Sequence, residues 1–147
     1  MSPFDWRSVL LAKHAQHVVL IHFPIALFIA AVVFDMLMIR WQRRELAAVV
    51  YYNLLGAALV VIPAVLTGLL AWQLALEGQR LKGALLLHLL FGMGSAIIIM
   101  WSWWIHYRAR EAATHLPRWR IPLEIAGVLL LMTTGHLGGY LSGVNAP

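Results

Sequence analysis

The 147-residue chain contains no cysteine. This absence excludes disulfides, thiolate-bound iron–sulfur clusters, zinc–thiolate sites, covalently attached haem and thiol catalysis on this chain. Charged residues are also scarce, because they make up only 12% of the sequence. A soluble domain carries roughly a quarter of charged residues, so the composition does not fit a fully water-exposed surface.

Apolar residues are abundant instead and account for 62% of the chain. They form four blocks, at about 18–39, 49–74, 84–105 and 121–141, each close to the length with which a helix crosses a hydrocarbon core. With short connections between the blocks, the sequence predicts an all-α, integral membrane four-helix up-down bundle, in which residues 1–147 form a single membrane domain. Residues 6–17 are expected to form a short helix in the interface. A secretory signal peptide is the competing reading of the first block, but it fits poorly because no cleavage site follows the block.

The net charge of +5 comes mainly from two connections, "RWQRRE" (40–45) and "HYRAREAATHLPRWR" (106–120). Basic residues concentrate in the cytoplasmic loops of membrane proteins. The pattern therefore predicts a multi-pass protein of the bacterial inner membrane with both termini on the periplasmic side. It also argues against nucleic acid as a partner and in favour of the lipid bilayer.

Three histidines fall at a similar predicted depth. His22 and His88 lie about four residues into the first and third blocks, and His136 lies about five residues before the end of the fourth. At 1.5 Å per residue, all three are roughly 6–8 Å inside the outer boundary, with His17 just above them. Pro24 suits the first turn of a helix, so a second reading starts the regular helix only at Phe23 or Pro24 and puts His17 and His22 on an approach segment. Both readings keep His22 near the outer interface.

Neutral imidazole is a ligand for haem iron, copper, zinc and non-haem iron. We expect haem b between facing helices, with His22 and His88 as the axial pair and His136 as a substitute ligand or a ligand to a second haem. His17 is a further candidate cofactor ligand. A metal site formed by His22, His88 and His136 is the chief alternative. His14, His106 and His115 are expected to be polar residues of turns or the interface.

Two acidic residues lie within the apolar blocks. Asp35 is expected to form an ion pair with Arg40, Arg43 or an arginine of the other basic connection, and a role in a proton path is the alternative. Glu124 is interpreted as a first-turn acid favoured by the helix dipole. No serine–histidine–aspartate or paired-carboxylate catalytic pattern occurs, which favours a non-catalytic protein.

The segment "HVVLIHFPIALF" (17–28) resembles the opening of a bacterial membrane-protein family described as a domain of unknown function. Members of that family begin His-Pro-x-x-x-His-Phe-Pro-Ile-Ala-Leu, and Val18 replaces the usual proline here. The segments "VFDML", "LTGLLAW" and "GHLGGYL" also resemble family features, as does a histidine at position 88. The resemblance implies a four-helix protein in a redox setting, associated with Rieske or cytochrome c modules, and supports His17, His22, His88 and His136 as haem ligands.

These patterns predict an electron-transfer protein or a subunit of a respiratory complex, with haem near the periplasmic face. Quinone is a second candidate cofactor, as the membrane electron donor. The partners would be other subunits of a redox complex, or a periplasmic cytochrome or Rieske protein. A cofactor-free accessory subunit is the alternative, and a metal-ion or proton transporter using the histidines and Asp35 is the weakest reading.

Overall fold

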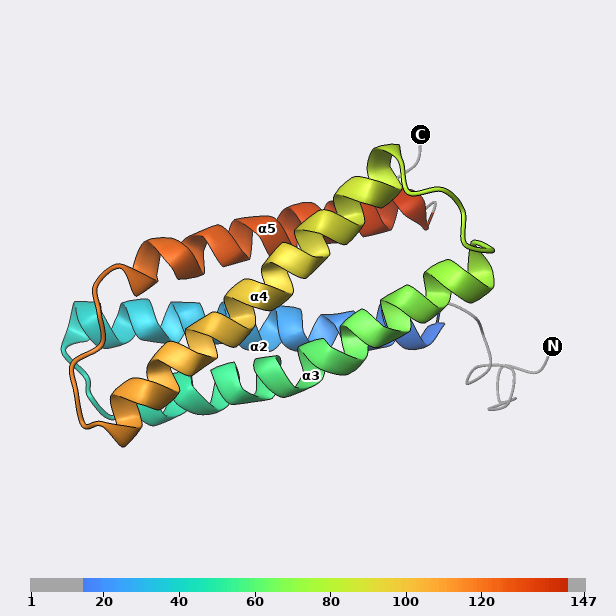
Figure 1. Ribbon diagram of the computed structural model, residues 1–147. Coiled ribbons are helices and arrows are strands. Elements are labelled where there is room, and N and C mark those ends of the chain that lie inside the picture. Colours follow the sequence, from blue (N-terminus) through green and yellow to red (C-terminus); the bar gives the residue numbers. More distant parts are fainter. Residues whose placement is uncertain (1–14, 143–147) are drawn as a thin grey trace, which may run out of the picture.

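The computed structural model describes residues 15–142 of the chain, and every regular element in that range is a helix. The helices are α2 (Ala15–Trp41), α3 (Leu46–Ala75), α4 (Gly83–Glu111) and α5 (Arg120–Leu141). All four are long and apolar enough to cross a membrane. The predicted four-helix architecture of a multi-pass membrane protein is therefore confirmed (Figure 1).

The helices run alternately up and down, so the bundle has two distinct ends (Figure 1). We call the end with Ala15, Leu141 and the connection 76–82 the terminal end, and the end with connections 42–45 and 112–119 the basic end. Helix α2 packs against α3 and α5, and α4 packs against the same two helices, so α2 and α4 are diagonal. Both ends of the described chain thus lie on one side, and the assignment of that side to the periplasm stays a prediction.

The first helix starts earlier than the sequence indicated. Helix α2 begins at Ala15 and continues through His17, His22 and Pro24, so these histidines are not on an irregular approach segment. A proline inside a helix removes one backbone hydrogen bond, which neighbouring helices in a membrane protein can compensate. The predicted interfacial helix 6–17 lies almost entirely outside the described residues.

The buried core is thin, and most large apolar side chains point outward. Phe28, Leu54 and Ile99 are fully buried, whereas residues such as Leu59 and Met132 are more than 60% exposed. Helices that are apolar on all sides are typical of membrane spans. Gly127 allows α5 to approach α2 closely, because a Cβ atom there would lie 2.8 Å from Phe28 Cε1.

The α2–α3 hairpin and the α4–α5 hairpin repeat one arrangement. His88 follows His17 by 71 positions, and His106 follows Asp35 by the same number. Equivalent positions differ by 71 in residue number between α2 and α4, and by 70 between α3 and α5. Under this correspondence, buried residues of one hairpin match buried residues of the other. The matching pairs are Pro24 and Ser95, Phe28 and Ile99, Ala31 and Ser102, Val50 and Arg120, Leu54 and Glu124, Ala57 and Gly127, and Val61 and Leu131. The two hairpins therefore share one register, as a two-fold repeat about the bundle axis would give.

Candidate functional site

Two histidines on diagonal helices face each other near the terminal end. The ring centroids of His17 (α2) and His88 (α4) are 6.5 Å apart, and the ring planes are perpendicular, at 90°. His17 and His88 are equivalent positions of the two hairpins. The repeat therefore brings the same side chain from both halves toward the bundle axis.

Each of these rings is held by a backbone carbonyl of the neighbouring helix. His17 Nδ1 lies 3.0 Å from Ala64 O, and His88 Nδ1 lies 3.0 Å from Thr134 O. The two bonds span 47 and 46 residues, so they are also equivalent between the hairpins. A carbonyl oxygen only accepts, so each Nδ1 donates, and in the neutral ring the lone pair belongs to Nε2.

Two glycines make room for these imidazoles. A Cβ atom at Gly68 would lie 2.9 Å from His17 Cε1, and a Cβ atom at Gly138 would lie 3.1 Å from His88 Cε1. These positions are also equivalent in the two hairpins. Each ring thus packs against the backbone of the neighbouring helix, which fixes its position between the helices.

The other two predicted ligands lie elsewhere. His22 is exposed, and its Nδ1 is 2.6 Å from Val18 O of its own helix. His136 is also exposed on α5. Of His22, His88 and His136, only His88 is turned toward another histidine, and that histidine is His17. The ligand set stays a prediction, but the contacts favour His17 over His22 as the partner of His88.

A second polar cluster occupies the interior of the basic end. Arg120 Nε donates to Asp35 Oδ2 at 2.8 Å, and Arg120 Nη2 donates to Asp35 Oδ1 at 3.0 Å. Both side chains are at least 95% buried. Arg120 Nη1 also donates to Pro117 O. The predicted ion pair between Asp35 and an arginine of the other basic connection is confirmed, and the partner is Arg120.

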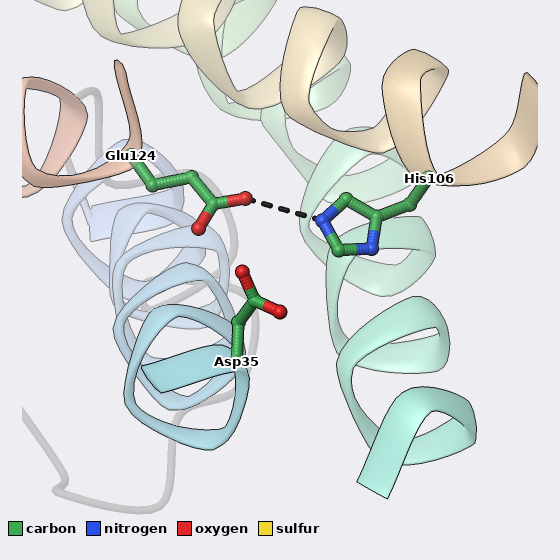
Figure 2. Close-up of side chains that lie close together, drawn as sticks. All are labelled: Asp35, His106 and Glu124. Carbon is green, nitrogen blue, oxygen red and sulfur yellow. Dashed lines mark hydrogen bonds and ion pairs between the residues drawn. The ribbon is translucent and has the colours of Figure 1, made fainter. Parts of the chain in front are cut away.

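Glu124 and His106 complete this cluster (Figure 2). His106 Nε2 lies 3.2 Å from Glu124 Oε1, and both side chains are almost fully buried. Glu124 Oε2 has no hydrogen-bond partner among the described residues. The interpretation of Glu124 as a first-turn acid is wrong, because α5 starts at Arg120 and turns Glu124 into the core. His106, expected to be a polar residue of a turn or the interface, is likewise buried inside the bundle.

A regular spacing of polar residues in the sequence could have indicated this second cluster. His17 and Asp35 are 18 residues apart, as are His88 and His106, and this spacing is about five full helical turns. The two members of each pair therefore share one face of their helix. Arg120 and Glu124, four residues apart, also share a face. Among residues 15–142, the only set of three possible metal-ligand side chains whose atoms lie within 4.8 Å of one another is Asp35, His106 and Glu124.

Comparison with known proteins gives a family and no closer relative. No curated protein matches the chain, and no solved structure matches it. A family model described as a predicted membrane protein (DUF2231) matches residues 13–145, which include all four described helices and both polar clusters. The chain therefore belongs to this family of predicted membrane proteins.

Proposed function

We propose that the protein is a membrane-embedded electron-transfer protein, or a subunit of a redox complex, that binds haem b between His17 and His88. The observation that carries the proposal is the pair of opposed imidazoles whose Nδ1 atoms are both anchored to backbone carbonyls. This pairing replaces His22 with His17 as the axial partner of His88.

The separation of the rings suits two axial ligands. An imidazole nitrogen binds a metal at about 2 Å, so rings on opposite sides of one ion have centroids roughly 6 Å apart. The observed distance of 6.5 Å is close to this value. The separation of the His17 and His88 rings is therefore compatible with two ligands to one metal.

The hydrogen bonds also suit a ligand role. A metal-binding histidine usually donates its other ring N–H to a carbonyl or carboxylate, which fixes the tautomer and makes the ligating nitrogen more basic. The carbonyls of Ala64 and Thr134 provide this for His17 and His88. Gly68 and Gly138 let the rings lie directly against the backbone of the neighbouring helices. The residues present therefore fit a bis-histidine haem.

Bound haem would supply one-electron chemistry, and the protein would set its potential through the two axial histidines and the apolar surroundings. In this proposal the terminal end faces the periplasm of a bacterial inner membrane. Quinol in the bilayer is the proposed donor, and a periplasmic cytochrome or Rieske protein, or another subunit of the complex, is the proposed acceptor.

The test is a reduced-minus-oxidised absorbance spectrum of the detergent-purified protein, with haem quantified as pyridine haemochrome. We expect a b-type α-band and one haem per chain. His17→Ala and His88→Ala should abolish stoichiometric haem binding. His22→Ala on the same helix as His17, and His136→Ala on α5, are matched controls that should retain it.

The oxidised protein provides an independent check of ring geometry. Perpendicular imidazole planes give a strongly anisotropic low-spin ferric signal in electron paramagnetic resonance, whereas parallel planes do not. We expect the anisotropic signal from the 90° arrangement. Loss of haem in His22→Ala but not in His17→Ala would mean that His22, and not His17, pairs with His88 as a haem ligand. A flat spectrum from haem-replete cells, together with a blank metal analysis, would favour the cofactor-free accessory subunit.

A further inference from the structure

The buried cluster at the basic end consists of Asp35, His106, Arg120 and Glu124, which we call the basic-end tetrad. All four side chains are at least 95% buried. They come from α2, α4 and α5, and Figure 2 shows three of them, Asp35, His106 and Glu124, close together inside the bundle. Arg120 joins this group through its hydrogen bonds to Asp35. The tetrad is separate from the His17–His88 pair, and the proposed electron transfer does not use it.

The charges of the tetrad do not balance without a bound proton. Arg120 is always charged, and it neutralises Asp35 through two hydrogen bonds. Glu124 would then leave one uncompensated negative charge if it were ionised and His106 were neutral. An isolated charge in a low-dielectric interior is very costly and is usually removed by protonation.

We infer that the basic-end tetrad is a proton-binding site that holds one proton, shared by Glu124 and His106, at neutral pH. The proton has two positions. It can make His106 an imidazolium that donates to Glu124 Oε1 across the observed 3.2 Å contact. Alternatively, it can reside on Glu124 Oε2, the buried oxygen that has no partner among the described residues and lies on the side of Asp35 in Figure 2.

A proton fits this site better than a metal ion does. Although Asp35, His106 and Glu124 have the side chains of a metal site, both oxygens of Asp35 already accept from Arg120. A divalent cation would have to displace the guanidinium group or bind directly beside it. A proton adds charge to the Glu124–His106 pair without disturbing the Asp35–Arg120 pair.

The other groups around the tetrad do not supply the missing charge. Helix α3 contributes the buried apolar residues Val50 and Leu54 at this end. Its Tyr51 lies against the guanidinium group of Arg110, whose carbon atom is 4.6 Å from the ring centroid. Arg108 of α4 is exposed and lies 6.0 Å from the Trp104 ring. The balance of charge therefore depends on Glu124 and His106.

The chain allows a direct test without altering the tetrad. Its only glutamates are Glu45, Glu77, Glu111 and Glu124, and the first three are exposed. Carboxyl-¹³C glutamate labelling of the full chain in nanodiscs would report Glu124 as the one signal of a buried carboxyl group. Ring-¹⁵N histidine labelling would report the charge of His106, and His115→Gln would help to assign the histidine signals.

At neutral pH we expect either a protonated Glu124 carboxyl signal or an imidazolium signal from His106. Glu124→Gln should remove the first signal or return His106 to the neutral form, whereas Glu45→Gln should change neither. An ionised Glu124 beside a neutral His106 in the wild-type protein would overturn the inference. Displacement of the proton by one equivalent of Zn²⁺, seen as a shift of both signals, would overturn it in favour of a metal site.

Discussion

The two ends of the bundle use polar residues in opposite ways. At the terminal end the two hairpins contribute the same residue, and each imidazole is held by a backbone carbonyl. At the basic end the equivalent positions differ: Asp35 corresponds to His106, while Arg120 and Glu124 correspond to the apolar Val50 and Leu54. One end is therefore symmetric and the other is not.

The difference follows from charge. Two neutral histidines can face each other across a two-fold axis, because each has its own hydrogen-bond partner and neither repels the other. Two aspartates at positions 35 and 106 would place like charges together in a low-dielectric interior, which is strongly unfavourable. A repeat can therefore present a matched ligand pair at its axis, whereas a buried ionic cluster needs unlike residues.

The largest predicted effect comes from removing the buried Asp35–Arg120 ion pair at the basic end. Arg120→Met leaves Asp35 as a buried carboxylate that has lost both of its hydrogen bonds to the guanidinium group. Removing one partner of a buried ion pair costs about 3–5 kcal/mol. We expect a correspondingly large fall in the unfolding temperature of the detergent-purified protein, followed by circular dichroism.

Two variants separate the lost charge from lost packing. Arg43→Met removes an arginine that is 65% exposed and pairs with the exposed Glu45, so it should have little effect. The double variant Asp35→Leu with Arg120→Met should recover much of the stability, because replacing a buried pair by apolar residues is often neutral. An Arg120→Met variant as stable as the wild type would contradict the buried-pair interpretation.

A smaller effect is expected at the symmetric end. Gly68→Ala places a Cβ atom 2.9 Å from His17 Cε1, so the ring or the helix must move. Such overpacking costs about 1–3 kcal/mol. Gly138→Ala, at 3.1 Å from His88 Cε1, should cost less. The measurement is the unfolding temperature of each variant without added haem.

Gly135→Ala is the matched control for this end. Among the described residues, no atom other than the nearby backbone of α5 and the two neighbours of Gly135 in the chain lies within 4 Å of a Cβ at Gly135, and alanine is the better helix former. This variant should be at least as stable as the wild type. If Gly68→Ala and Gly135→Ala behaved alike, the close packing of His17 against α3 would be wrong.

The helices could be predicted from the sequence, but the directions of their side chains could not. Four apolar blocks of spanning length are enough to predict the spans, and the concentration of arginines in and beside two connections marks one end. Most positions on every side of the spans are apolar, so no continuous polar face marks the rotation of each helix. For this reason the sequence could not decide that His17 points inward and His22 points outward.

The sequence of a single span also does not show which residues of other helices it will contact across the bundle. The spacing of 18 residues puts His17 with Asp35 and His88 with His106 on shared faces. It does not show that these faces oppose each other, because that depends on the packing of α2, α4 and α5. The sequence predicts Glu124 to be a first-turn acid, whereas packing buries it beside His106.

The smallest predicted effect concerns an exposed ion pair at the basic end. The pKa of Glu45 is lowered by a hydrogen bond with its own backbone amide and by the Arg43 guanidinium group. A lowered pKa in the folded state means that Glu45 stabilises the protein above the unfolded pKa, and that this contribution is lost as the pH falls through the folded pKa. Glu45→Gln should therefore lower the unfolding temperature slightly at neutral pH and not at acidic pH.

Added salt should remove even this small difference, because exposed ion pairs are screened. The effect of Arg120→Met should persist in salt. Equal salt sensitivity of the two variants would mean that water reaches the Asp35–Arg120 pair.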